Sequence, residues 1–229
     1  GMVGETWDNW KENIRRTIEL SPESVTIYQM ELPYNTVYSS DILGNKIEVP
    51  VADWPTKRDW VDFAFTELGA AGYHVSSAYT MIKDPSQVSF SYRDNLWKGS
   101  DLLATGIASF GHVSDVHYQN LPEWKDYVGA LLEENRLPLG RALRPTEEQL
   151  LIREVILQLK RGYLDAGYFQ EKFSTDILER WKTVWNQYAD DGLLTLGESR
   201  VELTRQGLLR ADSLLPAFFA EEHQGIRYT

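Results

Sequence analysis

The sequence predicts an α/β fold in two parts, a β/α portion with a parallel sheet and a winged-helix-like C-terminal domain. Helix and strand patterns alternate through the first half of the chain, an order that is typical of parallel β/α units. The last third has the order three helices, a hairpin and a helix. The 229 residues, of which 42% are hydrophobic and 25% charged, suffice for one large or two modest globular domains.

The first half contains two predicted helix–strand units. An amphipathic helix follows Thr6, a residue that can cap it, and its apolar residues are spaced three and four apart. The β-branched and aromatic run 24–33 predicts a strand that ends at a proline. A second helix is expected over 56–68, and the alternating pattern over 73–82 predicts the second strand.

The middle of the chain is less regular. Residues 34–55 are polar and predict a long irregular excursion, whereas 90–113 predict a strand and its return. A helix is expected to start near Asn120-Leu121-Pro122. The segment 135–145 carries prolines and a glycine between two helical patterns, so we expect a first domain over 1–136 and a second over 137–229.

The C-terminal domain has the clearest local signals. Thr146 and Gln149 fit a capping box, in which each side chain accepts a hydrogen bond from the other residue's backbone N–H. Further helices are expected over 165–173 and 175–190, then a hairpin over 192–204 around Gly197-Glu198-Ser199, and a last helix over about 205–219.

A winged helix suggests DNA binding, but the charge argues against it. From Pro145 onward there are ten Lys and Arg residues against fourteen Asp and Glu, and the expected recognition helix offers only Arg180 and Lys182 as cations. The whole chain carries a net charge of −11. A groove-reading helix needs a basic surface to hold the phosphates, so we expect no nucleic-acid partner and regard a winged-helix regulator as the weakest alternative.

The sequence contains no cysteine. Disulfides, zinc held by cysteine, a cysteine nucleophile and a cysteine-bound iron–sulfur cluster held by this chain alone are therefore excluded. No apolar run approaches the roughly 20 residues needed to span a bilayer, and no signal-peptide pattern opens the chain. We therefore expect a cytoplasmic protein without a membrane partner.

Two small segments are candidates for ligand binding. Gly106 to Gly111 forms a run of mostly small residues that can let a ligand approach the backbone, although small residues also simply end strands. Met30-Glu31-Leu32-Pro33 ends the first predicted strand, and the carboxyl ends of parallel strands are where ligands bind. Glu31 is either an acid–base or ligand-binding carboxylate or a solvated loop residue.

Other polar residues carry weaker signals. Tyr92 and Arg93 can hold an anion or stack on a ring, with a surface ion pair as the plainer interpretation of Arg93. His112 and His117 flank Asp115, but their spacing fits no helical or zinc pattern, so ordinary histidines explain them better. We expect no metal ligands and no catalytic residue in this chain.

Taken in order, several segments resemble the C-terminal half of the oxygen-independent coproporphyrinogen III oxidase family of radical SAM enzymes. "GMVGETWDNWKENIRRTIEL" is similar to the family's G-x-x-x-x-T strand end and the helix after it, and "SVTIYQMELP" is similar to the strand that ends in its (A/M)-(H/E)-L-P. "SDLLATGIASFG" resembles its D-x-L-x-x-G-x-x-A/S turn. The stretch from "LIREVILQLKRGYLDAGYFQEKF" to "DGLLTLGESRVELTRQGLLRADSLLPAFF" resembles its helical C-terminal domain with the D-G-L…V-x-L-T-x-x-G hairpin.

The resemblance implies a partial β/α half-barrel of radical SAM type followed by the winged-helix-like domain. The family's enzymes use S-adenosylmethionine and a [4Fe–4S] cluster, act on porphyrin or haem, and include haem-trafficking and ring-opening relatives. The resemblance also implies that Met30 and Phe110 help to seat S-adenosylmethionine, with Gly106 and Ala108 forming the turn that permits close approach.

The chain departs from the family in lacking the C-x-x-x-C-x-x-C motif and the early strands around it. We therefore expect either a fragment or a degenerate homologue that binds neither cofactor alone and is catalytically inert. A non-catalytic module that holds a tetrapyrrole or a partner chain is the alternative. A half-barrel exposes a sheet edge and an apolar face, so we expect self-association through residues 1–120.

Overall fold

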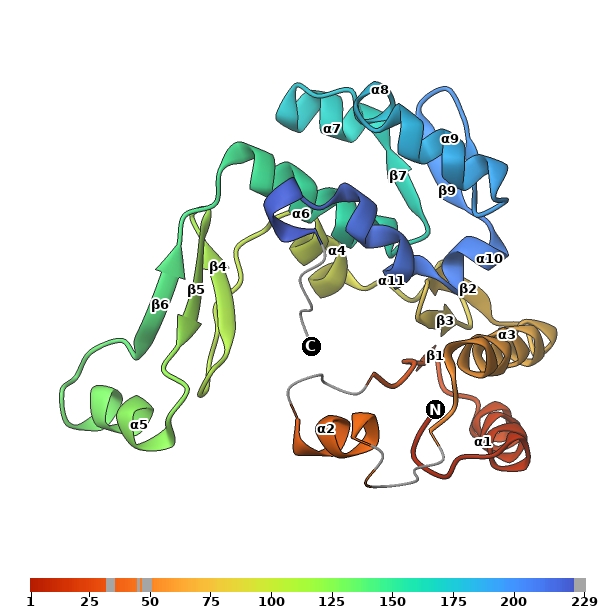
Figure 1. Cartoon of the computed structure of the whole chain (residues 1–229), viewed down its shortest axis with the longest axis horizontal. Coiled ribbons are helices and arrows are strands. Elements are labelled where there is room, and N and C mark those ends of the chain that lie inside the picture. Colours follow the sequence, from red (N-terminus) through yellow and green to blue (C-terminus); the bar gives the residue numbers. More distant parts are fainter. Residues whose placement is uncertain (32–35, 45, 47–50, 225–229) are drawn as a thin grey trace.

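In the described part of the chain, three small antiparallel sheets form, with helices packed against the first and the third (Figure 1). The computed structural model describes residues 1–31, 36–44, 46 and 51–224. The α/β class predicted from the sequence is confirmed, but the pairing of the first sheet is not the parallel one that was expected.

The first sheet has the order β1-β3-β2, with β1 at Ser24–Thr26, β2 at His74–Ser77 and β3 at Thr80–Ile82. β3 pairs antiparallel with both neighbours, so the prediction of parallel neighbouring strands was wrong. The run 73–82 does alternate, but it turns back at Ala78-Tyr79 and makes a hairpin instead of one strand. Alternation reports which side chains face inward, and a hairpin preserves it across a two-residue turn.

Helices α1 (Trp7–Leu20) and α3 (Trp54–Ala70) pack against this sheet. Thr6 caps α1 as predicted, and Asp53 caps α3 by accepting a hydrogen bond from the Thr56 N–H. The shared core consists of Ile14, Ile27, Val61, Ala64, Phe65, Leu68, Tyr73 and Met81. Helix α2 (Val37–Leu43) lies within the excursion predicted to be irregular, so that prediction was wrong for 37–43. Residues 34–35, 45 and 47–50 of this excursion lie outside the described residues.

The second sheet has the order β4-β5-β6 and extends away from the rest of the protein, with α5 near its far end (Figure 1). Its strands are Phe110–Val113, Val116–Asn120 and Leu139–Leu143, and helix α5 is Trp124–Leu132. Residues 91–97 of the predicted strand pair form helix α4 (Ser91–Trp97), and the return is a bridge between Leu102 and His112. β6 lies within the segment 135–145 that was predicted to separate the two domains. All of its residues are exposed, so this segment has no alternating apolar pattern that would indicate a strand.

The C-terminal part follows the predicted order closely. Helix α6 (Glu147–Leu159) begins with the predicted capping box, and the predicted hairpin is β8 (Leu194–Leu196) with β9 (Arg200–Leu203). The remaining elements are β7 (Tyr163–Asp165), α7 (Ala166–Phe173), α8 (Ile177–Arg180), α9 (Lys182–Asp190), α10 (Arg205–Leu208), α11 (Ala211–Leu214) and two 3₁₀ turns, Leu215–Phe218 and Glu221–His223.

Three details of this part were not predicted. The expected helix over 175–190 breaks at Trp181, and the expected last helix is three short pieces. Strand β7 pairs with β9 and completes the third sheet, in the order β7-β9-β8. Three residues are too few for an alternating pattern to identify a strand.

The two parts meet at the turn between β2 and β3. Ala78 is buried in the core of the C-terminal part, and Tyr79 packs against the same core. The backbone N–H of Ala78 donates to the carbonyl of Lys160, just after α6, at 2.9 Å. This contact places the end of α6 beside the end of β1, where the candidate site lies.

Candidate functional site

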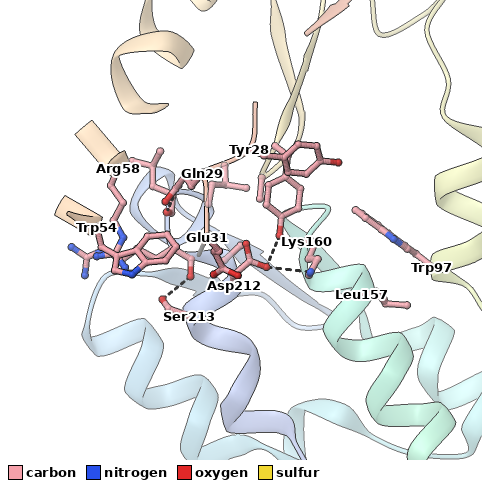
Figure 2. A pocket seen from close by; sticks show the side chains of 16 residues that line it. Tyr28, Gln29, Glu31, Trp54, Arg58, Trp97, Leu157, Lys160, Asp212 and Ser213 are labelled. Atoms are coloured by element: carbon pink, nitrogen blue, oxygen red, sulfur yellow. Dashed lines mark hydrogen bonds and ion pairs between the residues drawn. The ribbon is translucent and has the colours of Figure 1, made fainter. Parts of the chain in front are cut away.

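A pocket of about 650 Å³ lies where the first sheet meets the C-terminal helices (Figure 2). A volume of this size is typical of small-molecule sites. One wall comes from the chain after β1, the start of α3 and the turn between β2 and β3; the other comes from the end of α6 and the segment from α10 to α11. The lining residues are Tyr28, Gln29, Glu31, Trp54, Arg58, Ala78, Tyr79, Trp97, Leu157, Lys160, Leu208, Leu209, Arg210, Ala211, Asp212 and Ser213.

A three-residue network crosses the pocket. The Tyr79 hydroxyl donates to Asp212 Oδ1 at 2.6 Å, and Lys160 Nζ lies 3.1 Å from the same oxygen (Figure 2). Burial, and then the negative charge of Asp212, raise the pKa of the Tyr79 hydroxyl well above its ordinary value. Tyr79 is therefore a neutral hydrogen-bond donor at physiological pH, and the Asp212 carboxylate is already occupied by two partners.

Two guanidinium groups line the opposite side. Among the residues that the structure describes, neither Arg58 nor Arg210 forms an ion pair, and the buried Nε of Arg58 has no hydrogen-bond partner. Burial, and after it the positive charge of Arg210, lower the pKa of Arg58 from its ordinary value. The Arg58 guanidinium lies 5.9 Å from the centre of the Trp54 ring.

Aromatic rings supply much of the apolar surface. Tyr28 is 73% exposed and Trp54 is 42% exposed, and both rings line the pocket. The Tyr28 ring lies 5.4 Å from the Tyr79 ring, centroid to centroid. Exposed rings at a concave surface are typical of sites that hold flat ligands.

Met30, the first of the predicted site residues, lies beside this pocket, because its neighbours Gln29 and Glu31 line it. The carbonyl of Met30 accepts a hydrogen bond from Lys57 Nζ at 2.7 Å, and the same ammonium lies 4.8 Å from the centre of the Trp54 ring. Lys57 therefore fixes the backbone at the end of the first strand. Leu32 and Pro33 of the predicted strand-end motif lie outside the described residues.

The other predicted site residues lie at the second sheet and are not among the pocket's lining residues. Gly106 has a φ of +95° and Ala108 one of +55°, so the chain makes a left-handed turn there. Asn120 Nδ2 donates to the Gly106 carbonyl at 3.0 Å, and the Ala108 N–H donates to the Leu121 carbonyl at 3.0 Å. Phe110 is half exposed and stacks on His117 at 5.4 Å.

The backbone groups of this turn are thus bonded within the protein. The Gly106 N–H donates to the Tyr127 hydroxyl, and the Ala108 carbonyl accepts from Gln119. A Cβ at Gly106 would meet only Ser109 Oγ, at 3.4 Å, so the positive φ and not crowding requires glycine here. The N–H donors of Gly106 and Ala108 are therefore already used within the protein.

The weaker candidates have structural partners. Arg93 pairs with Asp94 at 2.9 Å and lies over the rings of Phe90 and Trp97. His112 is buried, and its Nε2 lies 4.0 Å from Asp115 Oδ1. Within the described parts of the chain, no group of three or more metal-ligating side chains comes together.

Sequence reasoning singled out Glu31 and missed the rest of the polar lining. Arg58, Lys160, Arg210 and Asp212 are ordinary charged residues in helical patterns, and nothing local distinguishes them from a solvated helix face. The Asp212 carboxylate is shared by Tyr79 and Lys160 from distant parts of the chain, and only the tertiary structure shows this.

No family model matches the chain. It is 21% identical to the heme chaperone HemW of Bacillus subtilis (strain 168) over 224 residues, which are 96% of this chain and 57% of that protein. It is 32% identical to the oxygen-independent coproporphyrinogen III oxidase of Helicobacter pylori (strain J99) over 114 residues, which are 48% of this chain and 25% of that protein.

The solved structure of coproporphyrinogen III oxidase (HemN) from Escherichia coli, described as a radical SAM enzyme, shares the fold. The TM-score is 0.73 at 19% identity, over 95% of this chain and 52% of that one. The chain therefore shares the fold of about half of that structure. The chain is similar in sequence to oxygen-independent coproporphyrinogen III oxidases and heme chaperones, as the sequence motifs indicated. It spans about half the length of the Bacillus heme chaperone and of the HemN structure.

Of the helices in the described ranges, none combines the length and the apolar character needed to cross a membrane.

Proposed function

We propose that the chain is the C-terminal portion of a coproporphyrinogen III oxidase-like radical SAM protein of porphyrin or haem metabolism. The observation that carries this proposal is the match over nearly the whole chain, in sequence to the relatives and in fold to the solved enzyme. In this proposal residues 1–136 are the later part of a β/α barrel and residues 137–229 are a winged-helix-like domain. The helix, strand and hairpin order from α6 to β9 supports the second assignment.

The proposed S-adenosylmethionine seat consists of Met30, Gly106, Ala108 and Phe110. Met30 supports this role through its place at the edge of the pocket, with its carbonyl held by Lys57. Phe110 supports it because the ring is stacked on His117 on one side and remains half exposed. Since the backbone groups at Gly106 and Ala108 are internally bonded, their proposed contribution is a compact surface under the ligand.

The chain's residues do not fit the family's iron–sulfur cluster. Such clusters are bound by cysteine thiolates, and the sequence has none.

We expect the chain alone to release no 5′-deoxyadenosine from S-adenosylmethionine after anaerobic incubation with iron, sulfide and dithionite. The reason is that the chain has no cysteine thiolate to bind the iron–sulfur cluster that would act as the reductant. Chromatography of the quenched reaction measures the product, and an authentic radical SAM enzyme treated in parallel serves as the control. Product above the protein-free background would contradict this expectation.

Binding of the nucleoside is tested with S-adenosylhomocysteine, which carries the same adenosine without the reactive sulfonium. The proposed seat goes beyond the sequence-based expectation that the chain alone binds neither cofactor: we expect saturation-transfer NMR to show contact with the adenine protons. Phe110→Ala should reduce that signal at least three-fold, because base–aromatic contact is worth about 1 kcal/mol or more. The matched control is Trp124→Ala, which removes a 69% exposed ring on α5. Equal signals from the two variants would show that the Phe110 ring does not contact the adenine.

Self-association through residues 1–120 belongs to the same proposal. β1 and β2 are the edge strands of the first sheet, and Leu20, Tyr28 and Leu103 are each more than 70% exposed. Open sheet edges and exposed apolar side chains favour pairing with another chain. Sedimentation velocity at micromolar concentration measures it, and a monomer throughout would refute it.

A further inference from the structure

Strand β6 is a free edge of the second sheet. Among the strands that the structure describes, it pairs with β5 on one side and with no strand on the other. All of its residues, Leu139 to Leu143, are exposed, which holds for no other strand in the described ranges. The second sheet extends away from the rest of the protein, with β6 on its outer side, so this edge is open to another chain (Figure 1).

The backbone of β6 has hydrogen-bonding groups that point outward from the sheet. The N–H of Asn120 donates to the carbonyl of Ser109, beside β4, at 2.9 Å, whereas that of Leu121 donates to the chain just before β6, at 2.8 Å. Backbone groups alternate in this way along β5, so those of Tyr118 point toward β4. Ala142 lies opposite Tyr118, and its N–H and C=O therefore point away from β5, where an incoming strand can pair with both.

The segment that contains β6 is basic, although the protein as a whole is acidic. Residues 135–145 include three arginines and no Asp or Glu, in a chain whose net charge is −11. The first of the three, Arg136, forms an ion pair with a neighbouring glutamate. Arg141 donates through Nε to the neutral side chain of Gln119 at 2.7 Å. Within the part of the chain that the structure describes, neither Arg141 nor Arg144 has a carboxylate partner, so both can bind carboxylates of another chain.

Exposed apolar side chains accompany these cations. Leu139 is 46% exposed and Leu143 is 58% exposed. Leu143 lies opposite His117, whose ring is stacked on the half-exposed ring of Phe110. Arg141 is two residues from Leu143 and so lies on the same face of the sheet. A strand added at this edge therefore meets an apolar side chain and a cation side by side on one face.

The charge of this edge indicates which kind of strand fits it. A second copy of β6 would bring the same arginines to the same edge, and like charges across a strand pair are destabilising. A strand that carries carboxylates forms cross-strand pairs of opposite charge instead, and these are stabilising. The cations therefore select against self-pairing of β6 and in favour of an acidic partner.

We propose that the edge of β6 binds an extended acidic segment of a partner protein, which adds a strand to the second sheet. Backbone hydrogen bonds to Ala142 hold the segment, Arg141 and Arg144 bind its carboxylates, and Leu143 contacts an apolar side chain between them. The inference goes beyond the proposed function, whose self-association involves residues 1–120 and not β6.

The test uses two acetylated and amidated peptides, VTETVTET and VTKTVTKT, in which valine alternates with glutamate or with lysine on one face. Each is titrated at low salt into the isotope-labelled full chain, and the shifts of the Gly140 and Ala142 amide NMR signals give the affinity. We expect the glutamate peptide to bind about ten-fold or more tightly than the lysine peptide, because two arginines face opposite charges in one and like charges in the other. Added salt should reduce this difference, since screening weakens exposed charge pairs.

Variants at the strand separate the backbone contribution from the charge contribution. Ala142→Pro removes the outward N–H, and proline is tolerated on an edge strand at such a position, so the folded variant should bind the glutamate peptide about five-fold more weakly. Ala142→Val keeps the N–H and is the matched control, which should bind like the original chain. Arg144→Gln should weaken binding about three-fold, whereas Lys125→Gln, which removes an exposed cation on α5, should leave it within two-fold.

Four results would each overturn the proposal. The first two are equal affinities for the two peptides, and signal shifts that lie outside β6 and its neighbours. Shifts of the β6 signals with the concentration of the chain alone would identify a second copy as the occupant. Tighter binding of an oligothymidylate of eight nucleotides than of the glutamate peptide would identify a phosphate backbone as the ligand.

Discussion

Lys172→Met lowers the free energy of unfolding by about 2 to 3 kcal/mol, because it leaves a buried carboxylate without its counter-charge. Glu154 is 2% exposed, and its Oε1 lies 2.6 Å from Lys172 Nζ. The other carboxylate oxygen accepts a hydrogen bond from the Tyr168 hydroxyl at 2.5 Å. Urea denaturation followed by fluorescence measures the loss, which corresponds to roughly 5 to 10 °C in unfolding temperature for a chain of this size.

The Lys172 side chain also links the C-terminal part of the protein to the chain that follows α4. Lys172 Nζ also donates to the carbonyl of Lys98, just after α4, at 2.8 Å. Glu154 lies on α6, the helix whose end carries Leu157 and Lys160 into the pocket. The variant therefore also loses the hydrogen bond between α7 and the chain that follows α4, which adds to the expected loss of stability.

Two further variants test the cause. Lys182→Met removes an ion pair of similar length, 3.2 Å to Glu179, in which both side chains are more than 60% exposed, so its cost should stay within about 0.5 kcal/mol. The double variant Glu154→Met, Lys172→Met should recover most of the stability, because an apolar pair leaves no buried charge unpaired. A double variant as unstable as the single one would show that the ion pair is not the reason.

The C-terminal part was predictable because its signals are local. The capping box at Thr146 and Gln149 and the hairpin around Gly197 to Ser199 are set by hydrogen bonds between near neighbours, and both were confirmed. The same locality explains why helix α1 after Thr6 was predicted correctly. The family resemblance rested on the order of such segments, and the comparisons with HemN and the heme chaperones confirmed it.

The first sheet and the pocket could not be predicted in the same way. The alternating run over 73–82 fits a single strand and a hairpin equally, and it is the antiparallel pairing of β2 with β3 that shows the hairpin. The pocket brings together side chains more than 100 residues apart, such as Arg58 with Arg210 and Tyr79 with Asp212. Charged residues on helices look alike in sequence, and whether they are paired or repelled depends on packing between elements.

Gly207→Ala is expected to lower the free energy of unfolding by about 3 kcal/mol, the largest cost we expect from adding a single methyl group to this protein. A Cβ on Gly207 would lie 1.9 Å from the Leu193 carbonyl oxygen. That oxygen is already fixed by a hydrogen bond from the Thr204 N–H at 3.0 Å, so it cannot move away without breaking the start of α10. Thermal unfolding followed by circular dichroism measures the loss.

A displacement of α10 by the added methyl group also reaches the pocket. Leu208, the last residue of α10, lines the pocket together with Leu209 and Arg210, so a displaced α10 also changes this wall of the pocket. Gly129→Ala is the matched control: it lies inside α5, its nearest neighbour to an added Cβ is 3.9 Å away, and alanine should stabilise the helix by about 0.5 to 1 kcal/mol. A Gly207→Ala protein that unfolded at the temperature of the original chain would show that the added methyl group does not collide with the Leu193 carbonyl.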